Sequence, residues 1–498
     1  MTENVSRTAN PAPERSERDR WIALVVLCAG FLMIILDQTI VNVALPSIQS
    51  DLGFTQSSLA WVVNAYLIAF GGLLLLAGRL GDLVGRKRMF MIGLTVFTAA
   101  SLLCGVSQSQ EMLIGARFVQ GIGGAMTSAV ILGMIVTMFP QPAEQAKAIG
   151  IYSFVAAGGA SIGLLAGGVL TEAINWHWIF FVNLPIGIVT AVLATRLIDN
   201  DEGIGLNRGA DVPGAALIVG ALMLTVYTIV ETENHGWGSA RTLILGAVAL
   251  GLIGAFVLRE ARAKTPLIPL RIFRSRVMSG ANLVQALAVG GLFGMFFLGA
   301  LYLQRVLGYG AIEVGLAFLP VALLIGILSV GVSARLIVRF GARATLLPGL
   351  VFILAGLLLF GRAPVDATYA TDILPAMLLL GLGGGLFFAA LMTLAMSAAT
   401  PEDSGLASGL VNTTQQVGGA LGLAIIATLS ASRTDHLRAS GDPIANALTG
   451  GYHLAFTIGA GLVLGAIVLA VALLRPAAPA VEGELVETEE REVELEAA

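Results

Sequence analysis

Long apolar runs separated by short polar segments make up most of this chain. A helix that crosses the hydrocarbon core of a bilayer needs about 20 apolar residues. We count fourteen runs near that length, at residues 21–44, 57–77, 89–107, 111–138, 147–170, 178–197, 212–231, 241–259, 276–301, 312–334, 344–361, 372–398, 405–430 and 452–474. Many of them are rich in glycine, which is typical of helices that pack closely in lipid. The pattern therefore predicts an all-α polytopic membrane protein.

The composition agrees with a membrane location. Of the 498 residues, 56% are hydrophobic and 12% are charged, whereas soluble proteins carry about 25% charged residues. The two cysteines lie inside apolar runs and the four histidines form no ligand pattern, so we expect neither a disulfide framework nor a metal site. We expect the lipid bilayer as a partner and no nucleic acid. The excess of Arg over Lys, with many Ala and Gly, suggests a bacterial source.

The distribution of basic residues predicts the orientation. An even number of spans places both termini on one side of the membrane. With the termini in the cytoplasm, 22 basic residues fall inside, 5 fall outside and Arg117 lies within a span. Because Lys and Arg concentrate in cytoplasmic loops, both termini are predicted to be cytoplasmic, in a bacterial inner membrane. The polar segments 1–20 and 475–498, the second of them acidic, are expected to be disordered cytoplasmic ends.

An internal repeat indicates two halves. The segments "GRLGDLVGRKR" (78–88) and "ARLIVRFGARA" (334–344) share Arg, Leu and Gly in register. Each follows a span and enters a predicted cytoplasmic loop, and the offset fits six spans plus an inserted pair. The chain is therefore expected to comprise a six-helix bundle at 21–197, two inserted spans with linkers at 198–275 and a second bundle at 276–474. Parallel repeats of this kind are typical of transporters whose halves rock around a midplane site.

Several motifs resemble those of one family. "GRLGDLVGRKR" resembles the loop motif between spans 2 and 3 of the major facilitator superfamily, and "RFVQGIGGA" (117–125) resembles its arginine motif in span 4. Segments similar to those of its fourteen-span drug:proton antiporter branch are "LDQTIVNVALP" (36–46), "WHWIFFVNLPIG" (176–187), "PLIPLRIFRSR" (266–276) and "LYLQRVLGYGAIEVGLAFLP" (301–320). The resemblance covers about residues 20–475. It implies the major facilitator fold, with two six-helix halves plus two inserted helices.

The same resemblance implies a function. Members of this branch export hydrophobic, often cationic, drugs or toxic compounds in exchange for protons by alternating access. They are multidrug efflux and antibiotic resistance transporters rather than enzymes. The expected partners are a small hydrophobic or cationic substrate and protons. The energy source is the proton-motive force with no bound cofactor, and we expect a monomer.

One motif departs from the family pattern. Where the span-5 antiporter motif usually has proline, this chain has Leu164, in "GLLAGG" (163–168). A kink that depends on proline is therefore not supported here. The motif glycines that remain, and that permit close helix contact, are Gly159, Gly163, Gly167 and Gly168.

An acidic residue lies deep in the first run. Asp37 is sixteen residues after Trp21, or about 24 Å along a helix, and Arg117 is six residues after Glu111, or about 9 Å. The two spans run in opposite directions across a core about 30 Å thick, so the two side chains are expected at similar depth. Charges inside a membrane usually mark a substrate or ion pathway. We predict Asp37 as the proton-coupling carboxylate, as the family resemblance also implies.

For Arg117 two roles remain open and are compatible. It could tune Asp37 and change partner between conformations, or tether backbone carbonyls. For Asp37 the alternative is a boundary residue that reaches out of the membrane.

Two further groups of residues are candidates for function. The 78–88 segment is expected to act as a conformational latch, through Gly78, Asp82, Gly85, Arg86 and Arg88; Asp82 and Arg86 have the spacing of an i,i+4 ion pair. Val338 takes the aspartate position in the second repeat, so the latch is asymmetric. Polar and aromatic residues proposed to line a substrate cavity are Asn42, Trp61, Tyr66, Gln120, Asn282, Gln285, Phe293, Asn412 and Gln416.

Other functions stay open from the sequence alone. The same fold could export an endogenous natural product, siderophore or lipid, or could work as a symporter. A membrane enzyme is disfavoured because the chain has no P-loop, GxSxG, HExxH or haem motif. A sensor or scaffold would leave the charges at depth without a purpose.

Overall fold

Every regular element of the described structure is a helix. The computed structural model describes residues 17–201, 203, 205, 209–398 and 404–474. The first half contains α1 (Glu17–Leu52), the 3₁₀ turn η1 (Ser58–Ala60), α2 (Trp61–Val84), α3 (Arg86–Gly105), α4 (Gln110–Met138), α5 (Pro142–Ala173), α6 (Trp178–Phe181) and α7 (Asn183–Leu197). An inserted hairpin follows, made of α8 (Val212–His235) and α9 (Ala240–Arg262).

The second half repeats the helical pattern. Its elements are η3 (Leu270–Arg274), α10 (Arg276–Arg305), α11 (Ala311–Ile327), the π-helical turn η4 (Leu328–Val332), α12 (Ser333–Phe340), α13 (Ala342–Phe360), the π-helical turn η5 (Tyr369–Ile373), α14 (Leu374–Ser397), α15 (Ser404–Ala439) and α16 (Ile444–Leu473). This all-helical architecture confirms the predicted fold class.

Twelve helices of the described chain are long and apolar enough to cross a membrane. The two remaining apolar runs of the sequence, 147–170 and 312–334, lie within α5 and within the continuous segment α11–η4–α12. The structure is therefore compatible with the fourteen predicted spans. The predicted terminal segments fall almost entirely outside the described residues.

The internal repeat has a structural counterpart. Gly85 ends α2 and precedes α3 with φ +101°, and Gly341 ends α12 and precedes α13 with φ +87°. A residue with a Cβ atom rarely adopts this backbone conformation, which glycine tolerates. The two glycines that align in the sequence thus make the same helix–helix turn in each half.

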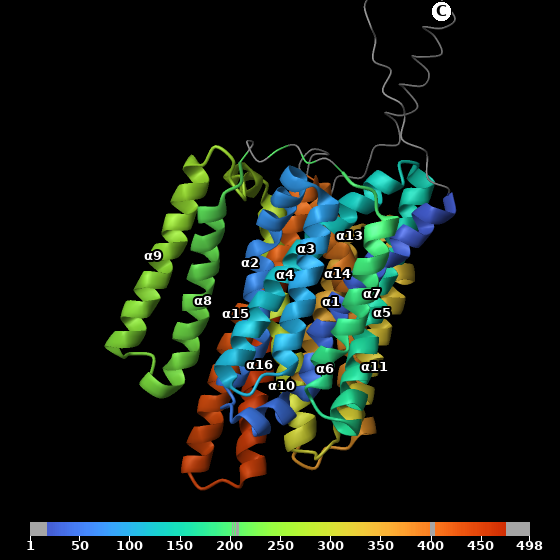
Figure 1. Cartoon of the computed structure of the whole chain (residues 1–498). Coiled ribbons are helices and arrows are strands. Elements are labelled where there is room, and N and C mark those ends of the chain that lie inside the picture. Colours follow the sequence, from blue (N-terminus) through green and yellow to red (C-terminus); the bar gives the residue numbers. More distant parts are fainter. Residues whose placement is uncertain (1–16, 202, 204, 206–208, 399–403, 475–498) are drawn as a thin grey trace, which may run out of the picture.

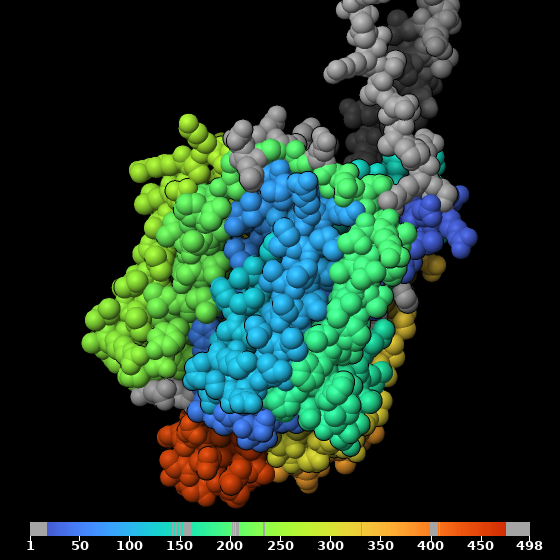
Figure 2. Space-filling model, in the orientation of Figure 1, coloured from blue at the N-terminus to red at the C-terminus, as the bar shows by residue number. Residues whose placement is uncertain are grey.

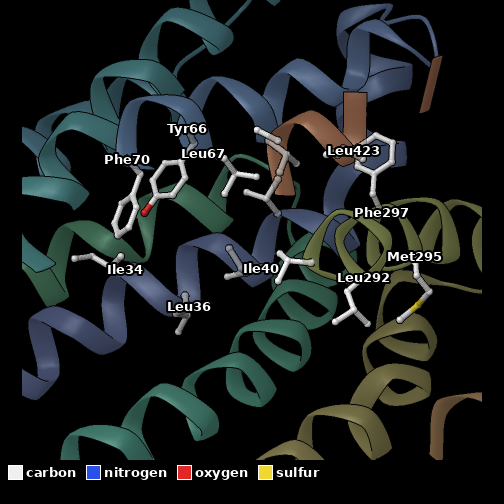
Figure 3. Packing of buried hydrophobic residues seen from close by; sticks show 14 of the residues in the cluster. Ile34, Leu36, Ile40, Tyr66, Leu67, Phe70, Leu292, Met295, Phe297 and Leu423 are labelled. Atoms are coloured by element: carbon white, nitrogen blue, oxygen red, sulfur yellow. The ribbon is translucent and has the colours of Figure 1, made fainter. Parts of the chain in front are cut away.

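The two halves pack around a common apolar core. Within the first half α1 contacts α5, and α4 contacts α2 and α3; within the second, α10 contacts α15 and α16, and α13 contacts α14. Between the halves, α5 contacts α11 and α2 contacts α15. Figure 3 shows buried side chains of both halves in one cluster, among them Ile40 of α1, Tyr66 of α2 and Leu292 of α10.

The inserted hairpin stands beside the bundle rather than inside it. In Figure 1 α8 and α9 lie at one side, and α8 contacts α2 and α15. Figure 2 shows the hairpin as a separate ridge next to α2. The outer helix α9 exposes large apolar side chains such as Leu243 (62%) and Leu250 (70%), as expected of a surface that faces lipid.

The end of the bundle at which α1 begins and α16 ends is called the terminal face below; it is the upper end in Figure 1. Arg20, near the start of α1, contacts Glu144 at the start of α5. Leu473, at the end of α16, packs against Gly280 near the start of α10. In Figure 1 the turn between α2 and α3 and the base of the α8–α9 hairpin also lie at this face. Arg79 Nε joins the two segments by donating to the Gly209 carbonyl (3.4 Å).

Candidate functional site: a buried ion pair and a central cavity

Asp37 lies in the middle of α1 and is completely buried. Its carboxylate oxygen Oδ2 accepts a hydrogen bond from Arg117 Nη1 of α4 at 2.6 Å, which forms an ion pair with both side chains almost fully shielded. This contact places Asp37 and Arg117 at similar depth, as their spacing along the two spans predicted. Because an unpaired charge in an apolar interior is costly, the pairing explains how both are tolerated.

Neutral amides complete the surroundings of the carboxylate. Asp37 Oδ1 accepts from Gln120 Nε2 (2.7 Å) and from Asn183 Nδ2 (2.9 Å). The Gln120 amide also donates to Ser101 Oγ (2.8 Å). The carboxylate therefore receives three N–H donors from α4 and α7, a geometry that suits its ionised form.

Arg117 is held on several sides. Its Nε donates to the Val62 carbonyl of α2 (2.9 Å), and its Nη1 also donates to Gln120 Oε1 (2.6 Å). The guanidinium carbon lies 4.4 Å from the centre of the Tyr66 ring and 5.7 Å from that of Phe180, distances suited to cation–π attraction. Arg117 thus contacts a backbone carbonyl and the Asp37 carboxylate in the same conformation.

Sequence reasoning missed two members of this cluster. Asn183 is buried at the start of α7, inside the quoted segment "WHWIFFVNLPIG", and Ser101 is buried in α3. Asn183 had a usable signal, because it is a lone amide in an apolar run directly before Leu-Pro. Ser101 had none, since a serine in a membrane helix commonly bonds to its own backbone, as Ser101 Oγ does to the Phe97 carbonyl (2.8 Å).

A cavity of about 790 Å³ lies between the halves and extends to the terminal face. Its wall includes the stacked rings of Phe31 and Tyr152, whose centres are 4.2 Å apart. The amide side chains at the wall are Gln38, Asn412, Gln415 and Gln416, and the charged side chains are Arg79, Asp82, Arg86 and Asp211. The cavity is thus mostly apolar and neutral at depth and charged at its mouth.

The halves are joined at the opposite face. Gln56 Nε2 donates to Ser430 Oγ (3.4 Å), Gln304 Nε2 donates to the Val43 carbonyl (2.9 Å), and the Ile312 amide donates to Glu172 Oε2 (3.1 Å). These bonds link the turn before η1 to α15, α10 to α1, and α11 to α5. The described conformation is accordingly closed at this face and open toward the terminal face.

Only part of the predicted cavity set reaches the cavity wall. Asn412 and Gln416 line it. Tyr66 and Gln120 do not line the cavity in the described conformation, because both are fully buried around the Asp37–Arg117 pair, where their polar groups find partners.

The other five predicted residues also lie away from this wall. Asn282 accepts from Thr414 Oγ1 (2.7 Å), and Gln285 Nε2 donates to Gln415 Oε1 (3.3 Å), so both form bonds between α10 and α15.

The remaining three residues make other contacts. Phe293 packs on Gly419, and Asn42 Nδ2 donates to the Gln38 carbonyl. Trp61 is buried at the start of α2. Sequence position could not reveal these contacts, because they depend on how each helix is rotated against its neighbours.

The predicted latch residues form contacts at the mouth of the cavity. Arg86 Nη2 pairs with Asp82 Oδ1 at 3.1 Å, and Arg86 Nη1 donates to the Gly133 carbonyl and to Thr137 Oγ1 of α4, both at 3.0 Å. Gly85 makes the helix turn described above. Gly78 lines the cavity, and Arg88 is exposed.

Asp201 also contacts the 78–88 segment, and the sequence did not predict this contact. Its two carboxylate oxygens accept from the backbone amides of Arg86 (2.5 Å) and Lys87 (3.0 Å) at the start of α3. A carboxylate at a helix N-terminus is favoured by the free N–H groups and the helix dipole.

The glycines of α5 allow close contact with two helices. A Cβ atom on Gly167 would lie 2.6 Å from the Ile40 carbonyl, and one on Gly159 would lie 2.9 Å from Leu32, both in α1. One on Gly163 would overlap Thr39 Oγ1, also in α1. Gly168 faces α11, where a Cβ atom would lie 2.7 Å from the Ala311 carbonyl. Leu164, in the motif's proline position, is buried in an unbroken α5, so no kink depends on it.

Two helical halves around a central cavity, with an ion pair buried in one half, are features of a secondary transporter. The chain belongs to the Major Facilitator Superfamily, whose family model matches residues 27–423. It is therefore a membrane transporter and not an enzyme, as the sequence motifs predicted.

Curated relatives cover nearly the whole chain. The puromycin resistance protein pur8 of Streptomyces alboniger is 41% identical over 464 residues, which are 91% of each chain. The cephamycin export protein CmcT of Amycolatopsis lactamdurans is 38% identical over 460 residues, 92% of each chain. The tetracenomycin C resistance and export protein of Streptomyces glaucescens is 34% identical over 83% of this chain and 76% of its own.

Solved structures support the fold. A bacterial homologue of the human lysosomal transporter Spinster, in an inward-facing and unoccupied conformation, superposes with a TM-score of 0.68. The match covers 94% of this chain and all of that one, at 16% sequence identity. At this identity the likeness concerns the fold alone.

Proposed function

We propose that this protein exports hydrophobic, cationic drugs or toxic compounds in exchange for protons, with Asp37 as the coupling carboxylate. It works by alternating access in a bacterial inner membrane, as a monomer with both termini in the cytoplasm. The observation that carries the proposal is the fully buried Asp37–Arg117 pair within a transporter fold. Resistance and export functions named for the relatives support a toxic organic compound as substrate.

The geometry suggests how proton binding acts on the fold. A proton on Asp37 removes the charge that Arg117 Nη1 contacts at 2.6 Å. The guanidinium keeps the Val62 carbonyl and Gln120 but loses its counter-ion, and a buried unpaired charge is costly. Relief requires movement between α1 and α4, and α1 contributes Phe31, Ile35 and Gln38 to the cavity wall. Protonation is thereby coupled to the shape of the cavity.

A chain of side chains connects the cavity to the ion pair. Gln38 lines the cavity, and its Nε2 donates to the Tyr66 hydroxyl (3.4 Å). The Tyr66 ring in turn lies against the Arg117 guanidinium. A substrate that displaces Gln38 would disturb Tyr66 and then Arg117, so substrate and proton compete without sharing one binding position.

The cavity wall fits a flat lipophilic compound. The stacked Phe31 and Tyr152 rings offer an apolar surface, and Gln38 and Gln416 offer amide hydrogen bonds. At the mouth of the cavity Asp82 pairs with Arg86 and Asp211 pairs with Arg259. This mouth faces the cytoplasm in the predicted orientation.

The test uses purified protein in liposomes with an imposed pH gradient and a pH-sensitive dye. Lipophilic cations and neutral drugs are added to the wild type, to Asp37→Asn and to Asp51→Asn. Asp51 is the matched control, because it lies in the same helix but is half exposed, near Trp176 and His177. We expect at least one compound to release protons through the wild type and Asp51→Asn but not through Asp37→Asn. Equal proton release through Asp37→Asn would reject the coupling role.

A second candidate is an exporter of one endogenous natural product. It is favoured by the similarity to the cephamycin export protein CmcT. A narrow response, in which a single antibiotic moves and the cation panel does not, would select this alternative.

A further inference from the structure

The base of the inserted hairpin carries a second set of buried carboxylates. Asp211 caps the start of α8, and Arg259 and Glu260 lie in the last turn of α9. Asp211 and Glu260 are each only 3% exposed. The predicted coupling residues do not include them, and the proposed function above does not use them as a pair.

One oxygen of each carboxylate is well bonded. Asp211 Oδ1 accepts from the Gly214 amide (2.9 Å) and from Arg259 Nε (2.6 Å). Glu260 Oε2 accepts from the Ile268 amide (2.9 Å) in the linker toward α10. The remaining oxygens, Asp211 Oδ2 and Glu260 Oε1, are shielded from solvent and have no hydrogen-bond partner among the described residues.

These two oxygens face the same small space beside Gly214. A Cβ atom at Gly214 would lie 2.6 Å from Asp211 Oδ2 and 2.9 Å from Glu260 Oε1. Two ionised carboxylates in one shielded site repel each other, whereas one proton between them turns one oxygen into a donor and leaves the other an acceptor. The described residues offer no third acidic, histidine or cysteine ligand for a metal ion.

We propose that Asp211 and Glu260 hold one proton between them, carried by Glu260, and so form a second proton-binding site at the mouth of the cavity. Asp211 keeps its charge because Arg259 and the Gly214 amide both donate to it. Arg259 comes from α9, and Arg79 of α2 bonds to the Gly209 carbonyl two residues before Asp211. With one proton bound, the two carboxyl groups keep a single negative charge, which the positive charge of Arg259 balances.

The location gives this proton a consequence. Asp211 lines the cavity together with Thr265 and Leu267 of the linker, and Glu260 anchors that linker through Ile268. Loss of the proton leaves two negative charges facing each other and weakens the packing of the hairpin against the linker. The inserted spans thereby acquire a function that mere spacing between the halves would not require. The inference is independent of the role of Asp37.

Infrared spectroscopy tests the proposal without any transported substrate. The full-length protein in lipid nanodiscs is titrated with pH, and the band of a protonated carboxyl group is followed in the wild type, Glu260→Gln, Asp211→Asn and Glu231→Gln. Glu231 is the matched control at the other end of the hairpin, where it pairs with Arg241 and His235. Gel filtration verifies that each variant is folded.

We expect Glu260→Gln to fold and to lose one titrating carboxyl band, because its amide can donate to Asp211 Oδ2 in place of the proton. Asp211→Asn should lose the same band, and Glu231→Gln should keep it. A band that persists in Glu260→Gln rejects the site, and one that persists in Asp211→Asn rejects the sharing. If a variant does not fold, isotope-labelled glutamate in the wild type must shift the band, and an unshifted band overturns the assignment to Glu260.

Discussion

The interiors of the two halves solve the same packing problem with different chemistry. The first half buries an ion pair, Asp37 with Arg117, at the centre of its helices. The second half holds α10 to α15 with neutral groups, such as Asn282 with Thr414. Among the described residues, every buried charged side chain belongs to the first half or to the hairpin. A neutral hydrogen bond can hold helices together at any pH, whereas an ion pair can be switched by a proton. The proton coupling that we propose therefore uses groups of the first half and the hairpin.

The largest effect is expected from breaking the ion pair on one side only. Arg117→Ala leaves Asp37 buried without its counter-ion, which costs on the order of 3–5 kcal/mol of folding free energy. Thermal and denaturant unfolding of the purified protein in detergent measure this loss. Asp37→Asn combined with Arg117→Ala should recover part of it. A single variant as stable as the wild type would contradict a charged pair.

Close backbone contact should matter equally in both halves. Gly163→Leu inserts a side chain between α5 and α1, and Gly422→Leu does the same between α15 and α10. Each is expected to lose about 1–3 kcal/mol of stability and most transport activity through overpacking.

The matched controls for these variants are Gly115→Leu and Gly461→Leu, where an added Cβ atom meets nothing within 4 Å. The unfolding midpoints of all four variants show whether the two halves are equally sensitive to overpacking. If only the first half were sensitive, the halves would differ in packing as well as in charge.

Weaker effects are expected from the neutral bonds of the second half. Asn282→Ala removes the acceptor of Thr414 Oγ1, and hydrogen bonds between membrane helices are worth about 0.6–2 kcal/mol. Proton release on drug addition should keep the pH dependence of the wild type at a reduced rate. A shifted pH profile would show that this half also takes part in proton coupling.

The smallest change in stability is expected at the latch. Asp82 and Arg86 are partly exposed, so Asp82→Asn should alter unfolding free energy by less than about 0.5 kcal/mol. The transport rate should fall nonetheless, because Asp82 contacts Arg86, and Arg86 in turn donates to Gly133 and Thr137 of α4. Val338→Asp, at the aligned position of the second half, should leave the rate unchanged. Comparable losses in both variants would mean that the two latches act symmetrically.

The class of protein and much of its layout could be predicted from the amino-acid pattern alone. Runs of about 20 apolar residues predict membrane helices, because a segment that spans a bilayer must satisfy its own backbone hydrogen-bonding groups. The Arg, Leu and Gly residues shared by 78–88 and 334–344 indicated the repeat. The structure explains the shared glycine, because a residue without a Cβ atom makes that turn easily. The opposite directions of the first and fourth spans sufficed to bring Asp37 and Arg117 to one depth.

Which side chains meet across helices could be seen only in the folded structure. Tyr66, Gln120 and Gln416 all appear in the sequence as polar side chains within apolar runs. In the structure Tyr66 and Gln120 surround the ion pair, whereas Gln416 lines the cavity. Their direction depends on the rotation of each helix about its axis, which is set by close contacts such as Gly71 against Gln416. The meeting of Asp211 with Glu260 depends likewise on the way α8 and α9 fold back on each other. Apolar periodicity carries little of this information, because a helix surrounded by lipid and other helices is apolar on nearly every side.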